Sequence, residues 1–186
     1  MPRAKRPSPP RSKLRVWQSR SQQHLLKNKY ISVRKDDVLR PNDRFSPYYV
    51  VERTDFAVIV PVLPNGDLVL VRQYRYPLKR YTWEFPMGIV NGVSMLQAAK
   101  TELIQETGYR ARRWRKLGAY YVAPGMMNQR AHVYLADGLT PGVPEPEEEE
   151  FIRCEQFSAK MVDTWIRKGQ FLDGPSLVAW LYFTKS

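Results

Sequence analysis

The stretch that decides the fold runs from Trp83 to Tyr109 and reads WEFPMGIVNGVSMLQAAKTELIQETGY. Its second half predicts a helix over 94–107. Ser94 and Gln97 fit the reciprocal Ser-x-x-Gln capping box, and Gly108 stands where helices commonly end. The residues expected to form the apolar stripe of this helix share a helical spacing: Leu96, Ala99 and Leu103.

Glu102 and Glu106 lie four residues apart on this helix, so their side chains emerge on the same side. Two like charges at this spacing repel each other by about a few tenths of a kcal/mol. The repulsion reverses if a divalent cation lies between them, because hard cations favour carboxylate oxygens. Spacing alone leaves two interpretations open, a metal site and a solvated acidic face.

Strands are predicted on both sides of this stretch. Segments 56–60 and 68–71 are rich in β-branched residues and flank Asn65-Gly66, which predicts a hairpin buried from two sides. An earlier hairpin is predicted from 30–34 and 48–51. The later elements are predicted as strands over 114–122, 130–136 and 151–154, a helix over 158–168, and a second helix beginning near Pro175. Strands and helices in this mixed order indicate an α/β (α+β) sandwich.

The positive charge is concentrated at the N-terminus. The formal net charge is +12, and residues 1–35 hold 11 of the 30 Lys and Arg but no acidic residue. We expect a basic, disordered tail over 1–25, followed by one domain over 26–186. Cys154 cannot form an internal disulfide, and no segment approaches the roughly 18 apolar residues of a membrane span. A soluble, cytoplasmic protein without a membrane partner is expected.

The stretch 83–109 resembles the Nudix hydrolase family, whose signature is G-x5-E-x7-R-E-U-x-E-E-x-G-U. The matching positions are Gly88, Glu102, Leu103, Glu106, Gly108 and Tyr109. One residue is missing between Gly88 and the helix. Three signature positions carry different residues: Val93 for the first Glu, Thr101 for the Arg, and Gln105 for the first member of the Glu-Glu pair.

Segments outside this box resemble the ADP-ribose pyrophosphatase branch of the family. They are 48–52, 68–75, 83–86, 123–125 leading into 130–135, the acidic loop, and 169–176. The resemblance implies a Nudix fold, a mixed sheet sandwiched between helices with an N-terminal β-hairpin extension. It also implies a homodimer, with residues 26–53 at its interface.

The same resemblance implies hydrolysis of ADP-ribose or a related nucleoside diphosphate derivative, with Mg²⁺ or Mn²⁺ as the cofactor. It assigns metal ligation to Glu102, Glu106 and the main-chain carbonyl of Met87. The positions occupied by Val93, Thr101 and Gln105 brace the catalytic helix in relatives. We hypothesise that apolar and neutral packing has replaced this brace, which weakens activity without abolishing it.

The resemblance also implies a water-activating base in the run Glu147-Glu148-Glu149-Glu150, with Glu149 and Glu150 as the candidates. A solvated acidic loop is the alternative. The residues expected to bind substrate are Arg72, Arg75, Glu84, Asn128 and Arg130. Arg72 and Arg75 lie on opposite faces of their strand, so only one of them needs to face the pocket. Trp17, Tyr30 and Tyr48 are candidates for stacking on adenine.

A non-catalytic interpretation stays open at this point. A degenerate Nudix module could bind a nucleotide, or bind RNA or a ribonucleoprotein through the basic tail and a basic cluster. That cluster consists of Arg110, Arg112, Arg113, Arg115 and Lys116. A solvated basic strand edge is the alternative for the cluster.

Overall fold

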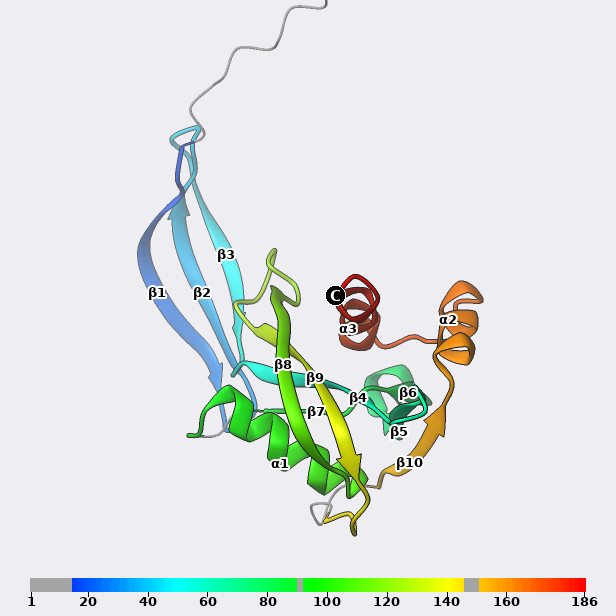
Figure 1. Cartoon of the computed structure of the whole chain (residues 1–186). Helices are drawn as coiled ribbons and strands as arrows, with labels where there is room; N and C mark the ends of the chain where they lie inside the picture. Colours follow the sequence, from blue (N-terminus) through cyan, green and yellow to red (C-terminus); the bar gives the residue numbers. More distant parts are fainter. Residues whose placement is uncertain (1–14, 90–91, 146–150) are drawn as a thin grey trace, which may run out of the picture. The chain divides into compact units, whose positions relative to one another are not determined.

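The computed structural model describes residues 15–89, 92–145 and 151–186 (Figure 1). The chain divides into two compact units, one ending at Glu52 and the other beginning at Arg53. The sequence predicts one domain over 26–186 with a hairpin subregion over 26–53, and the division between the two units lies at the end of that subregion. Among the described residues, no helix has the length and apolar character needed to cross a membrane.

The N-terminal unit is an antiparallel sheet in the order β1-β2-β3. Its strands are β1 (Gln18–Lys27), β2 (Ser32–Leu39) and β3 (Phe45–Glu52). The predicted hairpin is confirmed as β2 and β3. The tail predicted over 1–25 is wrong from Gln18 onward, because β1 pairs with β2 along its length. Every β1 side chain is exposed, so its sequence lacks the apolar alternation that identifies a strand.

Ion pairs crosslink β2 and β3. Arg34 Nε lies 2.9 Å from Asp36 Oδ1, and Arg34 Nη1 pairs with Glu52 on β3. The hydrogen bond that Arg34 donates to Asp36 raises the pKa of Arg34 against the opposing effect of burial, and the charges of Asp36 and Glu52 add to the increase. Asp36 is buried, and Arg34 is its ion-pair partner there.

The second unit is a seven-stranded mixed sheet in the order β10-β5-β4-β9-β8, with β6 on β5 and β7 on β4. Its strands are β4 (Phe56–Val62), β5 (Leu68–Arg75), β6 (Arg80–Glu84), β7 (Met87–Ile89), β8 (Arg110–Tyr121), β9 (Arg130–Thr140) and β10 (Arg153–Phe157). A 3-10 turn, η1 (Tyr76–Leu78), joins β5 to β6. Strands β4 and β9 are parallel, and the other pairs are antiparallel.

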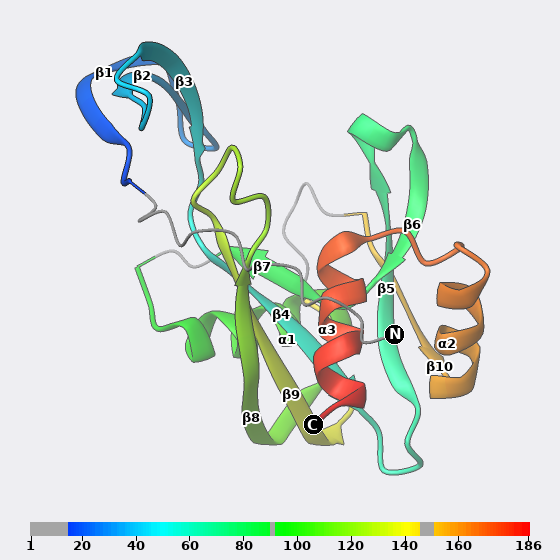
Figure 2. The same ribbon diagram turned by 90° about the horizontal axis from the view of Figure 1, so that it is seen from above.

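Helices cover both faces of this sheet (Figure 2). Helix α1 (Met95–Thr107) packs on one face, and α2 (Ala159–Arg167) and α3 (Gly174–Thr184) pack on the other. This arrangement confirms the predicted sandwich of a mixed sheet between helices.

Strand β4 forms the middle of both cores. Val58 and Val60 face α2 and α3, whereas Ala57 and Ile59 face α1, and all four are fully buried. Burial from two sides is therefore confirmed. The paired part of the β4–β5 hairpin is shorter than predicted. β4 pairs with β5 only near the turn and otherwise pairs with β7 and β9.

The ends of α1 are confirmed. The Ser94 hydroxyl accepts a hydrogen bond from the Gln97 N–H, and Gly108 adopts a φ of 75°. The predicted apolar stripe is wrong at Leu96, which is 36% exposed, because Met95 packs against the core at this end of α1 instead. Strands β6 and β7 were absent from the sequence prediction because they are only five and three residues long and flank Phe85-Pro86.

Two matched substitutions on α1 compare the stability contributed by a buried leucine with that of an exposed one. Leu103 is fully buried between α1 and the sheet, so Leu103→Ala should lower the free energy of unfolding by about 2–5 kcal/mol. Leu96→Ala should lower it by less than about 1 kcal/mol. Urea denaturation of both variants measures the difference, and equal losses would contradict this packing.

Candidate active site

The connection between β6 and β7 is held by hydrogen bonds from elements distant in sequence. The Phe85 N–H donates to Ser176 Oγ at 2.8 Å, and the Ile59 N–H donates to the Pro86 carbonyl at 2.9 Å. Ser176 is fully buried, and its own N–H donates to the Asp173 carboxylate that caps α3. Helix α3 and strand β4 therefore fix the backbone on which β7 begins.

The two carboxylates of α1 meet the backbone of β7. The Met87 N–H donates to Glu106 Oε2 at 3.0 Å, and Glu106 is only 5% exposed. The Glu102 carboxylate lies against Gly88, where a Cβ atom would be 1.8 Å from Glu102 Cδ. Only glycine allows this close approach, so the box glycine and the acidic pair form one structural unit.

This donor set fits a hard divalent cation. It offers two carboxylates and the main chain of β7, and among the described residues no group of three or more His, Cys, Asp and Glu is arranged to hold a metal. Mg²⁺ commonly binds through one or two protein carboxylates and takes its other ligands from water and substrate phosphates. The Met87 contact seen here is made by its N–H, and ligation by its carbonyl remains a prediction.

A buried ion pair lies on the face of β5 and β6 that is directed toward α1. Glu84 is fully buried and accepts hydrogen bonds from Arg75 Nε at 2.9 and 3.2 Å, and also from Arg75 Nη2. The Thr82 hydroxyl and the Gln73 amide also donate to this carboxylate. Two of the five expected substrate residues, Arg75 and Glu84, are thus direct partners of each other.

Charges on α1 and at the start of α3 also act on this ion pair. Burial lowers the pKa of Arg75, but the hydrogen bond and charge of Glu84 and the charges of Asp173 and Glu106 outweigh it and raise the pKa. Burial and the charge of Glu84 raise the pKa of Asp173, against the opposing effects of Ser176 and Arg75. One guanidinium group therefore stabilises three neighbouring carboxylates.

The sequence analysis missed Asp173 and Ser176 as positioning residues. Asp173-Gly-Pro-Ser176 precedes an apolar run, and an acidic residue three positions before Ser is a recognisable helix-start signal. The signal indicates a capped helix at this point. It does not indicate that Ser176 binds the backbone of Phe85.

Arg72 lies on the other face of β5. Its guanidinium group is centred 5.2 Å from the Tyr81 ring and 5.8 Å from the Trp83 ring. Arg72 is cross-strand to Trp83, and Arg75 is cross-strand to Arg80 three residues further along. The structure therefore separates the two arginines as their spacing predicts, and only Arg75 joins the buried ion pair with Glu84.

Asn128 and Arg130 lie in and after the connection between β8 and β9. Asn128 is exposed. The Arg130 guanidinium stacks over Tyr121 at 5.4 Å, and the main-chain N–H of Arg130 donates to Asp55 Oδ1 at 2.9 Å. These local contacts position the start of β9, and a substrate contact of either residue stays a prediction.

The acidic run Glu147–Glu150, including Glu149 and Glu150, lies outside the described residues. The segment before it packs on the end of α1, where the Glu145 N–H donates to the Gln105 carbonyl at 3.2 Å. The next strand, β10, continues from the other end of this run. The segment before the run is thus held at the C-terminal end of α1.

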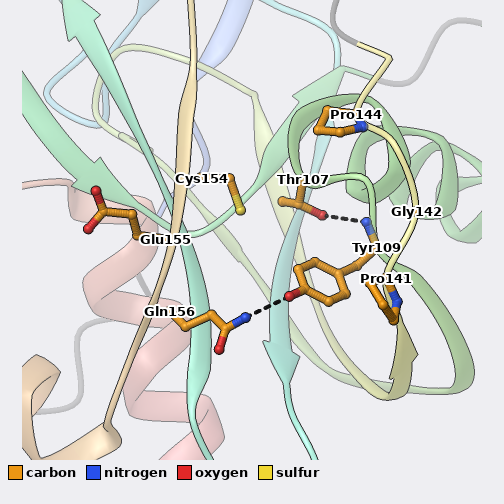
Figure 3. Close-up of a pocket in the computed structure, with 8 residues that line it drawn as sticks. All are labelled: Thr107, Tyr109, Pro141, Gly142, Pro144, Cys154, Glu155 and Gln156. Carbon is orange, nitrogen blue, oxygen red and sulfur yellow. Dashed lines mark hydrogen bonds between the residues drawn. The ribbon is translucent and has the colours of Figure 1, made fainter.

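A cavity of about 540 Å³ lies between the end of α1 and β10 (Figure 3). The Gln156 amide donates to the Tyr109 hydroxyl at 2.7 Å across it. The Cys154 thiol also lines the cavity, and burial, with the charges of Glu106 and Glu155, raises its pKa to about 11. The thiol is therefore protonated at neutral pH, as expected for an inert cysteine.

Two of the three substituted signature positions are exposed to solvent. Val93 is 49% exposed, and Thr101 is also exposed. The hypothesis that apolar packing has replaced the brace is therefore wrong at these two positions, because solvent surrounds them. Gln105 is half-buried, and its carbonyl holds the segment that precedes the acidic run.

The basic cluster on β8 is largely paired within the chain. Arg110 lies 3.7 Å from Glu145, Arg113 pairs with Asp137, and Arg115 donates to the Ser186 hydroxyl at 3.1 Å. Strand β8 lies at the edge of the sheet. Charged residues commonly protect such edges from pairing with another chain.

A mixed sheet between helices, with the acidic pair of one helix laid against the strand that contains Met87 and Gly88, defines the class of Nudix hydrolases. The chain belongs to the Nudix family, because the family model of the NUDIX domain matches residues 53–176. A second model, the nucleoside diphosphate sugar hydrolase N-terminal domain, matches residues 17–51. The two matches coincide closely with the two structural units.

Similar proteins support this assignment. Over 135 residues the chain is 31% identical to an ADP-ribose pyrophosphatase of Bacillus subtilis (strain 168), covering 71% of this chain and 73% of that protein. It is 35% identical over 122 residues to an ADP-ribose pyrophosphatase of Mycobacterium tuberculosis, covering 64% and 59%. The crystal structure of an ADP compounds hydrolase has the same fold, with a TM-score of 0.84 at 20% identity over 94% of this chain and 95% of that one.

The contact between Gly88 and Glu102 can be tested by adding one methyl group. Gly88→Ala should displace the Glu102 carboxylate, because the new Cβ would overlap it, and the affinity for Mg²⁺ should fall by at least about tenfold. Stability should change little, because the displaced atoms are the end of a flexible side chain. Isothermal titration with Mg²⁺ measures the affinity.

Gly125→Ala is the matched control, since a Cβ there meets no atom within 4 Å. It should bind Mg²⁺ as the wild type does. Wild-type affinity in Gly88→Ala would show that Glu102 is not positioned by this contact.

Proposed function

We propose that the protein hydrolyses the pyrophosphate of ADP-ribose or a related nucleoside diphosphate derivative, and releases a nucleoside monophosphate and a phosphorylated remainder. The observation that carries the proposal is the convergence of Glu102 and Glu106 on Gly88 and Met87. The names of the bacterial relatives support the substrate class.

Glu102, Glu106 and the Met87 carbonyl are the proposed holders of Mg²⁺ or Mn²⁺. When bound, such an ion neutralises pyrophosphate charge, activates water and stabilises the leaving oxygen. The protein's contribution is to hold two carboxylates close to one strand, with Glu106 fixed by the Met87 N–H. A pyrophosphate would otherwise be repelled by this acidic pair.

Arg75 is the proposed phosphate-binding residue. Glu84 engages its Nε and Nη2 atoms, whereas Nη1 has no hydrogen-bond partner among the described residues. The ion pair therefore fixes the plane of the guanidinium group and leaves one nitrogen for a phosphate oxygen. Glu84 would act as a positioning residue, because it is fully buried behind Arg75.

Glu149 or Glu150 is the proposed base that removes a proton from the attacking water. The support is the anchoring of the preceding segment, since Glu145 is bonded to the backbone of Gln105, the residue before Glu106. A general base must come within hydrogen-bond reach of its water, and this contact holds Glu145 at the C-terminal end of α1.

A homodimer formed through the N-terminal sheet is part of the proposal. Phe45 and Tyr49 lie on one face of β3, and each side chain is more than half exposed. Exposed aromatic residues grouped on one face commonly mark an interaction surface. Trp17, which contacts Tyr48 at 5.9 Å, and Tyr30 keep their proposed role as candidates for adenine stacking.

Activity can be measured with ADP-ribose, NADH and a sugar nucleotide, each with Mg²⁺ and with chelator. We expect metal-dependent release of nucleoside monophosphate from at least one of them. Glu106→Gln should lower kcat/KM by at least about 100-fold, because it removes charge from the proposed metal site. Asp163→Asn, which removes an exposed charge on α2, should behave as the wild type does.

A folded protein that binds nucleotide or RNA but releases no product would favour the non-catalytic alternative. Binding of RNA through several Lys and Arg contacts should weaken steeply between about 50 and 200 mM salt. The pairing of Arg110, Arg113 and Arg115 within the chain speaks against such a surface on β8.

The dimer can be tested by light scattering after size-exclusion chromatography. The wild type should have twice the chain mass of 21.8 kDa. Tyr49→Asp should reduce it to one chain mass, because it would bury a charge in an apolar interface. Met126→Asp adds the same charge to an exposed residue of the other unit and should stay dimeric. A monomeric wild type would contradict the dimer.

A further inference from the structure

Two arginines lie side by side on the face of β5 that points away from α1. Arg153 of β10 and Arg72 of β5 are directly cross-strand, and Trp83 of β6 continues the same row. Leu70, two residues before Arg72, packs in the core under α2 and α3, whereas Val69 packs under α1. This row is therefore on the opposite face from Arg75 and the acidic residues of α1.

Like charges placed directly opposite each other destabilise a strand pair. Glu155 compensates Arg153 by a salt bridge. Among the described residues, Arg72 has no carboxylate partner. Its guanidinium group makes cation–π contacts with the Tyr81 and Trp83 rings. Stacking on rings orients a guanidinium group and keeps its N–H donors available to an anion.

A cavity of about 470 Å³ opens at this arginine pair. Arg72, Arg153, Tyr81 and Phe151 line it, and the last two are strongly exposed aromatic residues. The volume lies within the range of about 300–1,000 Å³ common for small-molecule sites. Two guanidinium groups match a phosphate, and exposed rings match the flat face of a base.

We propose that this cavity binds a nucleoside monophosphate, with the phosphate between Arg72 and Arg153 and the base on Tyr81 or Phe151. The ligand needs both parts, since the cationic pair alone offers nothing to a base and the rings offer nothing to a phosphate. The site is separate from the metal centre, and its occupation requires neither metal nor turnover.

Photo-crosslinking with 8-azido-AMP in the presence of chelator locates the site directly. Tandem mass spectrometry of the labelled protein should find modified residues in 81–83 or 151–153. Arg72→Gln and Arg153→Gln should each raise the 8-azido-AMP concentration needed for half-maximal labelling by at least about tenfold, because each removes a charge-assisted contact. Arg72→Lys should recover part of the lost affinity.

Arg80→Gln is the matched control, since it removes the same charge from the same hairpin on the opposite face, and its labelling should equal that of the wild type. AMP should compete with the label, and ribose 5-phosphate and inorganic phosphate should compete at least about tenfold less well. Equal competition by all three would overturn the nucleotide assignment in favour of a phosphate site.

Labelling found only near Glu102, Glu106 or Arg75, or unchanged in both glutamine variants, would overturn the proposal. Thermal melting of each variant checks that it is folded. Failure of the hydrolysis assay leaves this labelling pattern unaffected, so the two proposals fail independently.

Discussion

The hydrogen bond from the Met87 N–H to the Glu106 carboxylate is the interaction on which the site depends. It places a nearly buried charge at the junction of α1 and the sheet, where an unpaired carboxylate would be costly. The bond fixes the rotation of α1, and this rotation carries Glu102 onto Gly88. The same bond keeps the Glu106 carboxylate near Arg75, where its charge helps to raise the pKa of Arg75. The position of α1, the placement of its acidic pair and the negative charge near Arg75 thus depend on one contact.

Local chemistry explains how much of the fold could be predicted. The ends of α1 follow from Ser94 and Gly108, and the burial of β4 follows from its run of β-branched residues. Strand β1 carries only two apolar residues, Leu25 and Leu26, and both are exposed, so no apolar alternation indicates the strand. Leu96 matches a helical spacing but faces solvent, because Met95 packs against the core at that end of α1. Tertiary contacts decide such cases.

The site was predictable where one element carries the information. Four-residue spacing places Glu102 and Glu106 together, and three-residue spacing places Arg72 and Arg75 on opposite faces. Which arginine faces the acidic helix depends on Glu84, a residue of another strand. The role of Ser176 depends on a partner 91 residues away. Contacts of that range leave no local pattern in the sequence.

That long-range bond also has a consequence for the order in which the protein is made. Ser176 belongs to α3, yet it holds the backbone of Phe85 just before β7. A nascent chain synthesised only as far as β10 already contains every strand and both acidic residues of α1, but lacks this anchor. Contacts between distant segments form late, after the entropy of closing the intervening loop has been overcome. The loop before β7 therefore reaches its final geometry only when α3 has docked, and the growing chain carries an incomplete site until then.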